Sequence, residues 1–247
     1  MTKQRLQKVI ARAGICSRRK AEDYIANGRV SVNEKVVCEP GTSVDPETDL
    51  ICVDGKELRA TPTVLYRFYK PRDVITSMQD THGRKTVGDF ARQLPTRVFP
   101  VGRLDRDVTG LLLLTNDGEF AQRMLHPRFS VPRTYYAVVP GKPKQEVFTR
   151  LKRGLELDCG FGCVLDAHAV KASKRTIELF GNIERDSSII SVTVTLGRKH
   201  FVKKILAAVG YPVKQLCRVS FGPYFLGNLR PGEIVKESIN TSIIEAI

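Results

Sequence analysis

The sequence lacks the features that tie a chain to a membrane. None of its apolar runs approaches the roughly 20 residues that a membrane-spanning helix needs, and no long basic amphipathic helix stands out. We therefore expect neither a membrane span nor a signal peptide. With 247 residues, the chain is long enough to bury a core without disulfide or metal cross-links.

Signatures of metals and nucleotide cofactors are missing as well. The four histidines form no H-E-x-x-H pattern, and the chain contains neither a GxGxxG sequence nor a P-loop. Six cysteines are scattered along it, and the close pair Cys159 and Cys163 has no second pair or nearby histidine at zinc-ligand spacing. These absences predict reduced thiols, a cytoplasmic location and a function that needs no metal and no cofactor.

Positive charge is what the chain has in excess. Its Lys and Arg residues number 40 against 26 Asp and Glu residues, for a formal net charge of +14, and the basic residues are spread over the whole length. A polyanion is the expected partner. Because no membrane-binding segment is visible, the charge favours nucleic acid over a lipid surface.

The N-terminal part of the chain predicts two helices and a small β-hairpin. Apolar residues share one helical face over residues 5–13. A second helix is expected over residues 17–27, with Ser17 as its cap, before a hairpin around the Asn33-Glu34 turn.

A linker is expected where the composition changes. The Asp54-Gly55 turn closes the first module, and residues 59–63 read Arg-Ala-Thr-Pro-Thr before a new apolar run begins. We therefore predict two domains, residues 1–58 and 63–247.

The second domain predicts an α+β fold. Its apolar segments follow one another at irregular spacing, without the steady βαβ alternation of a doubly wound fold, so we expect a mixed, largely antiparallel sheet flanked by helices. Strands are expected at residues 64–69, 111–115, 134–139, 176–180, 189–196 and 213–221. Helices are expected at residues 86–94, 119–125, 144–153 and 199–209.

Basic residues crowd the first module. Between Met1 and Lys35, nine basic residues stand against three acidic ones. Singly, each is typical of a solvated helix face, but as a cluster they favour contact with phosphates. The residues that we expect to bind RNA are Arg5, Lys8, Arg12, Arg18, Arg19, Lys20 and Arg29.

One carboxylate carries the best clue to chemistry. In the segment GRLDRDVTGLLLLTNDG, Asp105 lies between Arg103 and Arg106, directly before four leucines that predict a buried strand. Flanking guanidinium groups favour the ionised carboxylate, while partial burial opposes it. Such a residue can act as a nucleophile or base, although by itself the pattern is typical of a local salt bridge.

Motifs in both parts of the chain resemble known families. The N-terminal segment LQKVIARAGICSRRKAEDYIANGRVSVNEKVV resembles the alpha-L RNA-binding module of a small-subunit ribosomal protein and of tyrosyl-tRNA synthetases. The second domain resembles the RsuA/RluB family of ribosomal RNA pseudouridine synthases, in domain order as well as in motifs. The motifs that carry this resemblance are Lys70-Pro71 with His82-Gly83-Arg84-Lys85-Thr86-Val87, the GRLDRDVTGLLLLTNDG segment, His126-Pro127 with Arg133-Thr134-Tyr135, Gly197–Lys204 and Arg218–Gly222.

The resemblance implies an enzyme that isomerises uridine to pseudouridine in ribosomal RNA, with large-subunit RNA slightly favoured by His126-Pro127. The family's catalytic aspartate falls on Asp105, its stacking ring on Tyr135, and the basic residue that pairs with the aspartate on Lys203. The reaction needs no cofactor because nothing is oxidised or hydrolysed, and the target base must be flipped out of a helix. The matching motifs also imply that three arginines bind the substrate, namely Arg103, Arg133 and Arg218.

Four positions depart from the family's motifs. Phe201 stands where glutamine is usual, and Lys203 and Lys204 stand where two arginines are usual. A lysine neutralises a carboxylate but cannot form the two-pronged bond of a guanidinium group. Asp73 stands where glycine is usual in the first motif, so the resemblance does not predict the conformation of that turn.

Other functions stay open at this point. The alternative is an assembly factor that binds RNA on a synthase scaffold without catalysis, because the last motif is altered. A DNA-binding regulator is disfavoured, since the two N-terminal helices lack the context of a recognition helix. The expected partner is ribosomal RNA or a ribosomal subunit precursor, and we expect the chain to be a monomer that binds no membrane.

Overall fold

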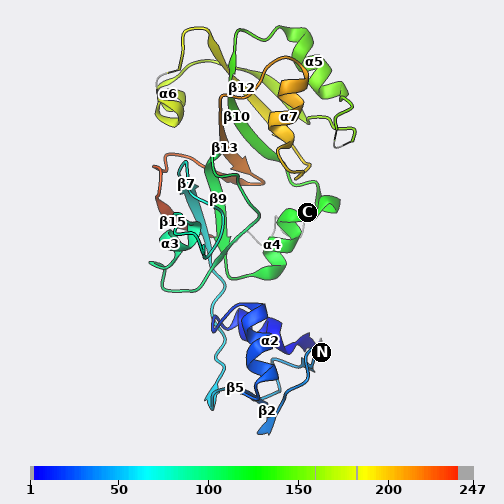
Figure 1. Ribbon diagram of the computed structural model, residues 1–247, viewed down its shortest axis with the longest axis vertical. Coiled ribbons are helices and arrows are strands. Elements are labelled where there is room, and N and C mark those ends of the chain that lie inside the picture. Colours follow the sequence, from blue (N-terminus) through cyan, green and yellow to red (C-terminus); the bar gives the residue numbers. More distant parts are fainter. Residues whose placement is uncertain (1–2, 159, 182, 239–247) are drawn as a thin grey trace. The chain divides into compact units, whose positions relative to one another are not determined.

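The structure, a computed structural model, describes residues 3–158, 160–181 and 183–238 and divides into two compact units. The first contains the described chain up to Val64 together with Leu94–Val98 and Asn116–Gly118, and the second contains the rest. Figure 1 shows the elements of each unit. The domain limits expected from the sequence, residues 1–58 and 63–247, stay a proposal.

The first unit packs two helices, α1 (Leu6–Arg12) and α2 (Arg18–Ala26), against short strands. As expected, Ser17 caps α2, because its hydroxyl accepts a hydrogen bond from the Lys20 backbone nitrogen at 3.2 Å. The buried core of this unit consists of Leu6, Ile10, Cys16, Ala21, Ile25, Val30, Val44, Ile51 and Val53. Its strands are β1 (Gln4–Arg5), β2 (Val30–Val32), β3 (Lys35–Val36), β4 (Ser43–Val44), β5 (Ile51–Val53) and β6 (Lys56–Glu57).

Two tight turns shape the strands of the first unit. Strands β3, β2, β5 and β6 form one antiparallel sheet in that order, and β1 pairs with β4. Asn33 and Glu34, with φ of 49° and 68°, form the two-residue turn between β2 and β3. Left-handed residues at both positions match the twist of a hairpin. The hairpin expected from the sequence is therefore confirmed.

A sheet of nine strands, counted over the described residues, forms the second unit. The order is β11-β12-β10-β13-β9-β7-β15, with β14 beside β13 and β8 beside β9. The β9–β13 pair is parallel and its neighbours are antiparallel, which confirms the mixed, largely antiparallel sheet. The strands are β7 (Leu65–Lys70), β8 (Phe99–Pro100), β9 (Thr109–Thr115), β10 (Arg133–Pro140), β11 (Asp166–Val170), β12 (Ser187–Val194), β13 (Gln215–Phe221), β14 (Tyr224–Phe225) and β15 (Ile234–Glu237).

Helices cover both sides of this sheet. Around strands β10 and β12, α5 and α7 lie on one side and α6 on the other (Figure 1). The helices are α3 (Val87–Ala91), α4 (Gly118–Leu125), α5 (Gln145–Arg153), α6 (Lys174–Phe180) and α7 (Phe201–Ala208), with a 3-10 turn at Pro127–Phe129. The α+β class predicted from the sequence is confirmed.

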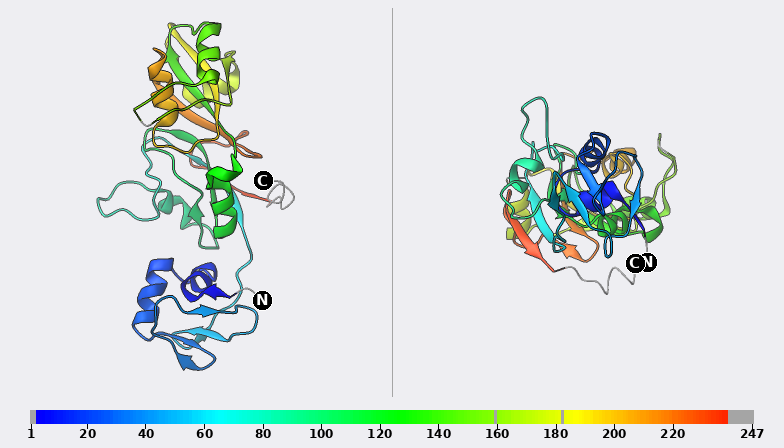
Figure 2. Two further views of the ribbon diagram at one scale, coloured as in Figure 1. Left: turned by 90° about the vertical axis from the view of Figure 1, so that its right-hand side faces the viewer. Right: turned by 90° about the horizontal axis from the view of Figure 1, so that it is seen from below.

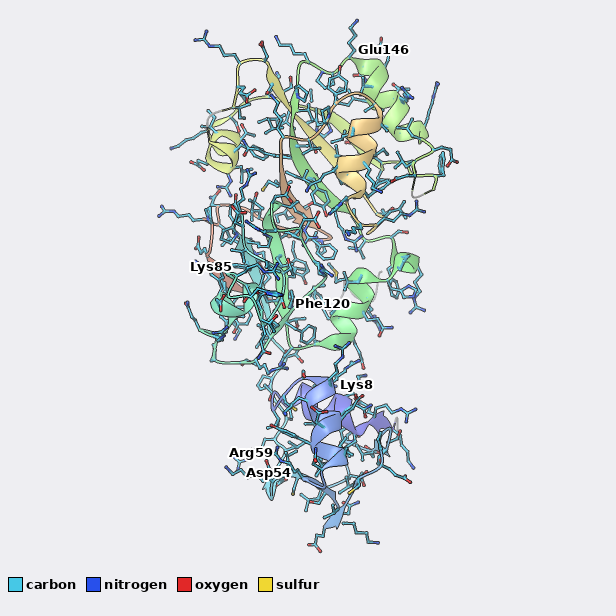
Figure 3. All side chains as sticks on the ribbon, viewed as in Figure 1. Lys8, Asp54, Arg59, Lys85, Phe120 and Glu146 are labelled. Atoms are coloured by element: carbon cyan, nitrogen blue, oxygen red, sulfur yellow. The ribbon has the colours of Figure 1, made fainter. Side chains whose placement is uncertain are left out.

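The leucine run forms an inner strand of the sheet, and the buried strand expected from the sequence is confirmed. Leu111 to Leu114 lie in β9, between β13 and β7, and their side chains are fully buried. Leu111 and Leu113 share one core cluster with Phe120, which projects from α4 toward the strands (Figure 3). Both faces of β9 are therefore covered, and the loop before it is attached to a rigid element.

A glycine sets the close approach of β9 to β13. A Cβ atom on Gly110 would lie 2.3 Å from the carbonyl oxygen of Arg218 and 2.6 Å from its backbone nitrogen, and φ at Gly110 is 104°. Only glycine fits such a conformation and such a contact. The parallel pairing that results holds the chain just after Asp105 against Arg218.

The strand predicted over residues 176–180 is wrong, because these residues form helix α6. Ser173 and Thr176 form a capping box, in which the Ser173 hydroxyl accepts from the Thr176 nitrogen and the Thr176 hydroxyl accepts from the Ser173 nitrogen. Thr176 and Phe180, four residues apart, are buried, whereas Ile177 is exposed. That spacing buries one helical face, and the local cap outweighs the β-branched composition.

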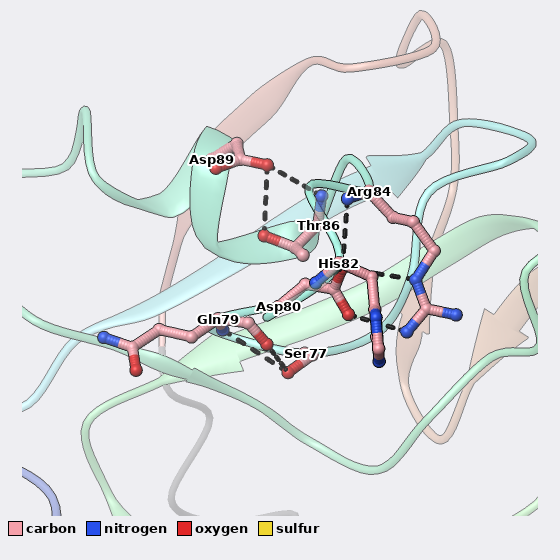
Figure 4. A network of polar contacts seen from close by, with 7 residues as sticks. All are labelled: Ser77, Gln79, Asp80, His82, Arg84, Thr86 and Asp89. Atoms are coloured by element: carbon pink, nitrogen blue, oxygen red, sulfur yellow. Dashed lines mark hydrogen bonds and ion pairs between the residues drawn. The ribbon is translucent and has the colours of Figure 1, made fainter.

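The loop between β7 and α3 is closed by its own polar groups (Figure 4). Asp80 accepts hydrogen bonds from the backbone nitrogens of His82 and Arg84, each at 3.0 Å, and pairs with the Arg84 guanidinium at 2.7 Å. The Arg84 side chain holds the pKa of the Asp80 carboxyl well below its usual range. Thr86 and Asp89 cap α3. This loop, which extends at the left of the left-hand view in Figure 2, is therefore built around a charged pair.

Candidate active site

A cavity of about 580 Å³ opens in the second unit beside the loop that leads into β9. Its wall combines that loop, strands β10 and β13, and the N-terminal half of α7. All the residues that the sequence marked for catalysis and substrate binding line it, namely Arg103, Asp105, Arg133, Tyr135, Lys203 and Arg218. Residues from distant parts of the sequence therefore line one cavity.

Strand order explains this convergence. Strand β13 lies between β10 and β9, and Arg218 is the register partner of Tyr135 on one side and of Gly110 on the other. The loop carrying Asp105 ends where β9 begins. The Asp105 side chain therefore lines the same cavity as Tyr135 and Arg218. Helix α7 adds Lys203 from the segment after β12.

The loop that carries Asp105 is held by backbone contacts. The Thr76 hydroxyl donates to the Leu104 carbonyl at 2.7 Å and accepts from the Leu104 nitrogen at 3.1 Å. The Val108 nitrogen donates to the Asp105 carbonyl at 3.1 Å. These bonds hold the backbone from which the Asp105 side chain projects.

Lys70 lies beneath the same loop, and its side chain is fully buried. Its ammonium group donates to the carbonyls of Pro71 at 2.9 Å, Val74 at 2.8 Å and Arg106 at 3.3 Å. Burial lowers the pKa of Lys70 to about 8, although the nearby carboxylates of Asp107, Asp73 and Asp105 oppose the shift. The cation therefore joins the turn after β7 to the loop before β9.

Asp105 faces side chains from the start of α7 and its N-cap rather than from its own loop. Oδ2 of Asp105 lies 3.4 Å from Nε2 of His200 and 3.7 Å from Nζ of Lys203. Arg106 pairs with Asp73 instead, at 3.1 Å. Asp73 has φ of 63°, a left-handed value that explains why glycine is usual at this position.

Lys203 is shared between two aspartates. Its ammonium group lies 2.8 Å from each carboxylate oxygen of Asp107, and this hydrogen bonding lowers the pKa of Asp107. The distance to Asp105, 3.7 Å, is that of an ion pair without a hydrogen bond. The sequence marked the pairing with Asp105 and missed Asp107.

The two adjacent tyrosines of β10 face opposite sides, as strand alternation predicts. Tyr135 lines the cavity, whereas Tyr136 packs against the core cluster of Leu111 and Phe221. A half-buried ring beside a carboxylate offers a stacking surface for a flat ligand.

The two arginines on the strands support the wall. Arg133 donates to the carbonyls of Thr195 at 2.9 Å and Met124 at 3.0 Å, and burial lowers its pKa. Arg218 donates from Nε to the Leu111 carbonyl at 2.8 Å. Both guanidinium groups lie 4.8 Å from the ring centre of Phe221. Within the described part of the chain, the buried Nη2 of Arg218 has no hydrogen-bond partner.

Two of the residues that depart from the family's motif at the start of α7 make structural contacts. Phe201 is buried, and a Cβ atom on Gly162 would lie 2.4 Å from its ring. Lys204 points away from the cavity and pairs with Asp158 at 2.7 Å. Phe201 therefore secures the loop after α5, where a glutamine would offer a polar group to the cavity.

In the first unit, the expected RNA-binding residues have three kinds of surroundings. Arg12, Arg18, Arg19 and Lys20 are exposed around the turn between α1 and α2. Arg29 is already neutralised, since it forms a two-pronged pair with Asp54 and lies 3.8 Å from the ring centre of Tyr24. The remaining members are Arg5, which donates to the Gly41 carbonyl, and the half-buried Lys8.

Three residues at this site were missed as site residues from the sequence: Lys70, Asp107 and His200. Lys70 carried a signal, because it ends an apolar strand just before Pro71 within a matched motif. Asp107 and His200 also lie within matched motifs, but the side chains that they contact come from distant segments. Spacing along the chain alone does not show such pairs.

The residues that the structure describes contain no helix with the length and hydrophobicity of a membrane span. No group of three or more His, Cys, Asp or Glu side chains among them is arranged to hold a metal ion. Cys159, one of the pair weighed as zinc ligands, lies outside the described residues.

Comparison with known proteins agrees with the site. Residues 64–208 match the family described as RNA pseudouridylate synthase, and residues 4–51 match the S4 domain. Ribosomal large subunit pseudouridine synthase B of Bacillus subtilis is 42% identical over 230 residues, covering 93% of this chain and 90% of that protein. A protein of Aquifex aeolicus named as an uncharacterized RNA pseudouridine synthase is 42% identical over 234 residues, covering 94% and 90%.

Among solved structures, one described as a crystal structure of pseudouridylate synthase superimposes with a TM-score of 0.62 at 25% identity, covering 98% of each chain. The resemblance of the two parts of the chain to an RNA-binding module and to a pseudouridine synthase is thus confirmed by the family matches, the relatives and the fold. This chain is an enzyme that belongs to the RNA pseudouridylate synthase family and carries an N-terminal S4 domain for RNA binding.

Proposed function

We propose that this enzyme converts one uridine, or a few, of large-subunit ribosomal RNA to pseudouridine, with Asp105 as the catalytic carboxylate. The observation that carries the proposal is the cavity in which Asp105, Tyr135 and Lys203 meet. The similarity to the large-subunit synthase of Bacillus subtilis supports the choice of RNA. The proposal includes action as a monomer in the cytosol, in keeping with the free cysteines of the described chain.

The reaction breaks the bond from ribose C1′ to N1 of uracil and forms one from C1′ to C5. The proton on C5 leaves and N1 gains one, so the atoms balance without a cofactor. An ionised Asp105 can begin this exchange by attack on the sugar or the base. The uridine must leave the helix to reach it, at a cost of a few kcal/mol, and Tyr135 supplies a ring on which it stacks.

The other residues have distinct parts in this proposal. The unpartnered Nη2 of Arg218 is a buried donor at the cavity wall, suited to a carbonyl or phosphate oxygen of the flipped nucleotide. Arg133 has both Nη atoms engaged with backbone carbonyls, so it contributes to the shape of the pocket. Arg103, exposed at the rim, is available to the RNA backbone.

The test is to incubate the purified protein with transcripts of large-subunit and small-subunit ribosomal RNA and to map pseudouridine in each. We expect modification at one or a few sites of the large-subunit RNA, absent when the protein is omitted. Modification of small-subunit RNA alone would reverse the choice of substrate. Binding of both RNAs without any pseudouridine would favour the assembly factor instead.

The exposed arginines at the start of α2 are expected to supply phosphate contacts. For Arg18→Ala combined with Arg19→Ala, we expect weaker RNA binding and a plot of log affinity against log salt that is shallower by about 1.5. Binding isotherms at several salt concentrations measure this slope. Arg29→Ala combined with Asp54→Ala removes an already compensated pair and is expected to leave the slope unchanged. An unaltered slope in the first variant would contradict the assignment.

A further inference from the structure

We infer that Asp107 is a positioning residue that holds Lys203 by hydrogen bonds, so that Lys203 supports Asp105 by charge and leaves its oxygens free to attack. The inference rests on the proposed function, since it assigns how the same site is tuned. Asp107 lies outside the lining of the cavity, and its effect passes through Lys203.

The geometry around the ammonium group carries this inference. An ammonium group has three N–H donors, and Nζ of Lys203 lies 2.8 Å from both Oδ1 and Oδ2 of Asp107. Nζ lies 3.7 Å from Oδ2 of Asp105, beyond hydrogen-bond reach. The lysine is therefore bonded to one aspartate and only electrostatically paired with the other.

Backbone contacts hold Asp105 and Asp107 within one turn. Asp105 and Asp107 belong to one turn, closed by the bond from the Val108 nitrogen to the Asp105 carbonyl. Lys70 binds the carbonyl of Arg106, the residue between them. The Lys203 side chain thus meets two carboxylates whose backbone is held in one turn.

The distinction matters for reactivity. The charge of Lys203 acts on Asp105 across 3.7 Å, while a direct hydrogen bond would occupy a lone pair that must attack. An arginine can bond two carboxylates at once with its fork, whereas a lysine is a compact point charge. In this chain, which has lysine where arginine is usual, Asp107 supplies the restraint.

Other polar and charged groups surround the pair and stay in place in the test. His200 approaches Asp105 at 3.4 Å from the start of α7. Lys70 lies beneath the loop, and Asp73 is engaged with Arg106. None of these groups is altered by the substitutions below, so the comparison isolates Lys203 and its two partners.

The first experiment measures steady-state kinetics of Asp107→Asn on the RNA that the unaltered enzyme modifies. We expect kcat to fall about tenfold with KM unchanged, because Lys203 then bonds directly to Asp105. Asp107→Glu, which keeps the charge, should recover most of the rate. Asp158→Asn is the matched control, since it removes the partner of the neighbouring Lys204 and is expected to leave kcat unchanged.

The second experiment repeats the change in the Lys203→Met background. There two carboxylates face each other without the ammonium group, and like charges disfavour the ionised form of each. Asp107→Asn removes one of them, so we expect it to raise kcat of Lys203→Met severalfold although it lowers kcat of the unaltered enzyme. A favourable effect that passes through Lys203 is lost in this background, and the repulsion that remains between the carboxylates gives the opposite sign.

The outcomes separate this inference from the proposed function. Sign reversal with unchanged KM supports both. Equal losses from Asp107→Asn in the two backgrounds, or a kcat unaffected in both, would overturn the role of Asp107 while the enzyme still makes pseudouridine. A melting temperature within a few degrees of the unaltered protein shows that each variant is folded.

Discussion

Asp105→Asn is expected to abolish pseudouridine formation while leaving RNA binding unchanged. An asparagine amide has nearly the shape of the carboxylate but is neither a nucleophile nor a base at neutral pH. Loss of a nucleophile that no neighbour replaces lowers kcat by at least about a thousandfold. The surrounding wall, with Tyr135 and Arg218, is untouched, so the flipped nucleotide keeps its contacts.

The measurement is pseudouridine formed per enzyme in single-turnover conditions, beside an RNA-binding isotherm for the same variant. Asp158→Asn, an aspartate of the same unit that does not line the cavity, is the control and should retain full turnover. Turnover of Asp105→Asn at the rate of the unaltered enzyme would assign the chemistry to another group. Equal loss of turnover and binding would indicate a structural role.

Lys70→Met is expected to destabilise the second unit and loosen the loop that carries Asp105. Methionine keeps the length of the side chain but donates nothing to the carbonyls of Pro71, Val74 and Arg106. Buried acceptors left without partners cost about 2–4 kcal/mol of unfolding free energy in total. We also expect kcat to fall, since the turn that holds Asp105 loses its support. Chemical denaturation at neutral pH measures the first effect.

The free energy of unfolding should also depend on pH through Lys70, which provides a second test of this prediction. The pKa of Lys70 is about 8 in the folded protein, against an ordinary value of 10.5. Below pH 8 both folded and unfolded chains carry the proton. Between pH 8 and 10.5 the unfolded chain binds more protons at this position, so stability rises with pH, by up to about 3 kcal/mol from this group.

Lys70→Met lacks this contribution, so the stability difference between the two proteins should widen from pH 7 to pH 10. Comparing the two proteins cancels the other groups that titrate in this range. Lys152→Met, which removes an exposed lysine paired with Asp166, is expected to show no such widening. A difference that stays constant with pH would mean that Lys70 keeps its proton in the folded state.

Local signals in the sequence predicted most of the fold correctly. The four leucines indicated a buried strand because an apolar run of that length is typical of one, and Ser17 indicated a helix start through its side-chain oxygen. The error at residues 176–180 arose where a capping box outweighed composition. Strands β11 and β15 were missed because their short, partly polar sequences pair only with distant strands.

At the candidate site, too, the sequence predicted the local features and missed the long-range contacts. Motifs marked Asp105 and distinguished Tyr135 from Tyr136, because chemistry and strand alternation are both local. The sequence also placed Asp105 between two arginines, yet Arg106 turns to Asp73 and the groups near Asp105 are His200 and Lys203. Charge partners depend on where side chains meet across the fold, and adjacency along the chain does not determine them.

The sequence by itself determined the family, the α+β class and the catalytic candidate, because each rests on residue types at short spacing. Only the tertiary structure decided that Lys203 bonds to Asp107, that Phe201 is a packing residue and that Lys70 supports the loop. These contacts join segments between 36 and 96 residues apart or depend on burial. Energies of burial and charge act through space, and the order of strands β10, β13 and β9 sets which residues share that space.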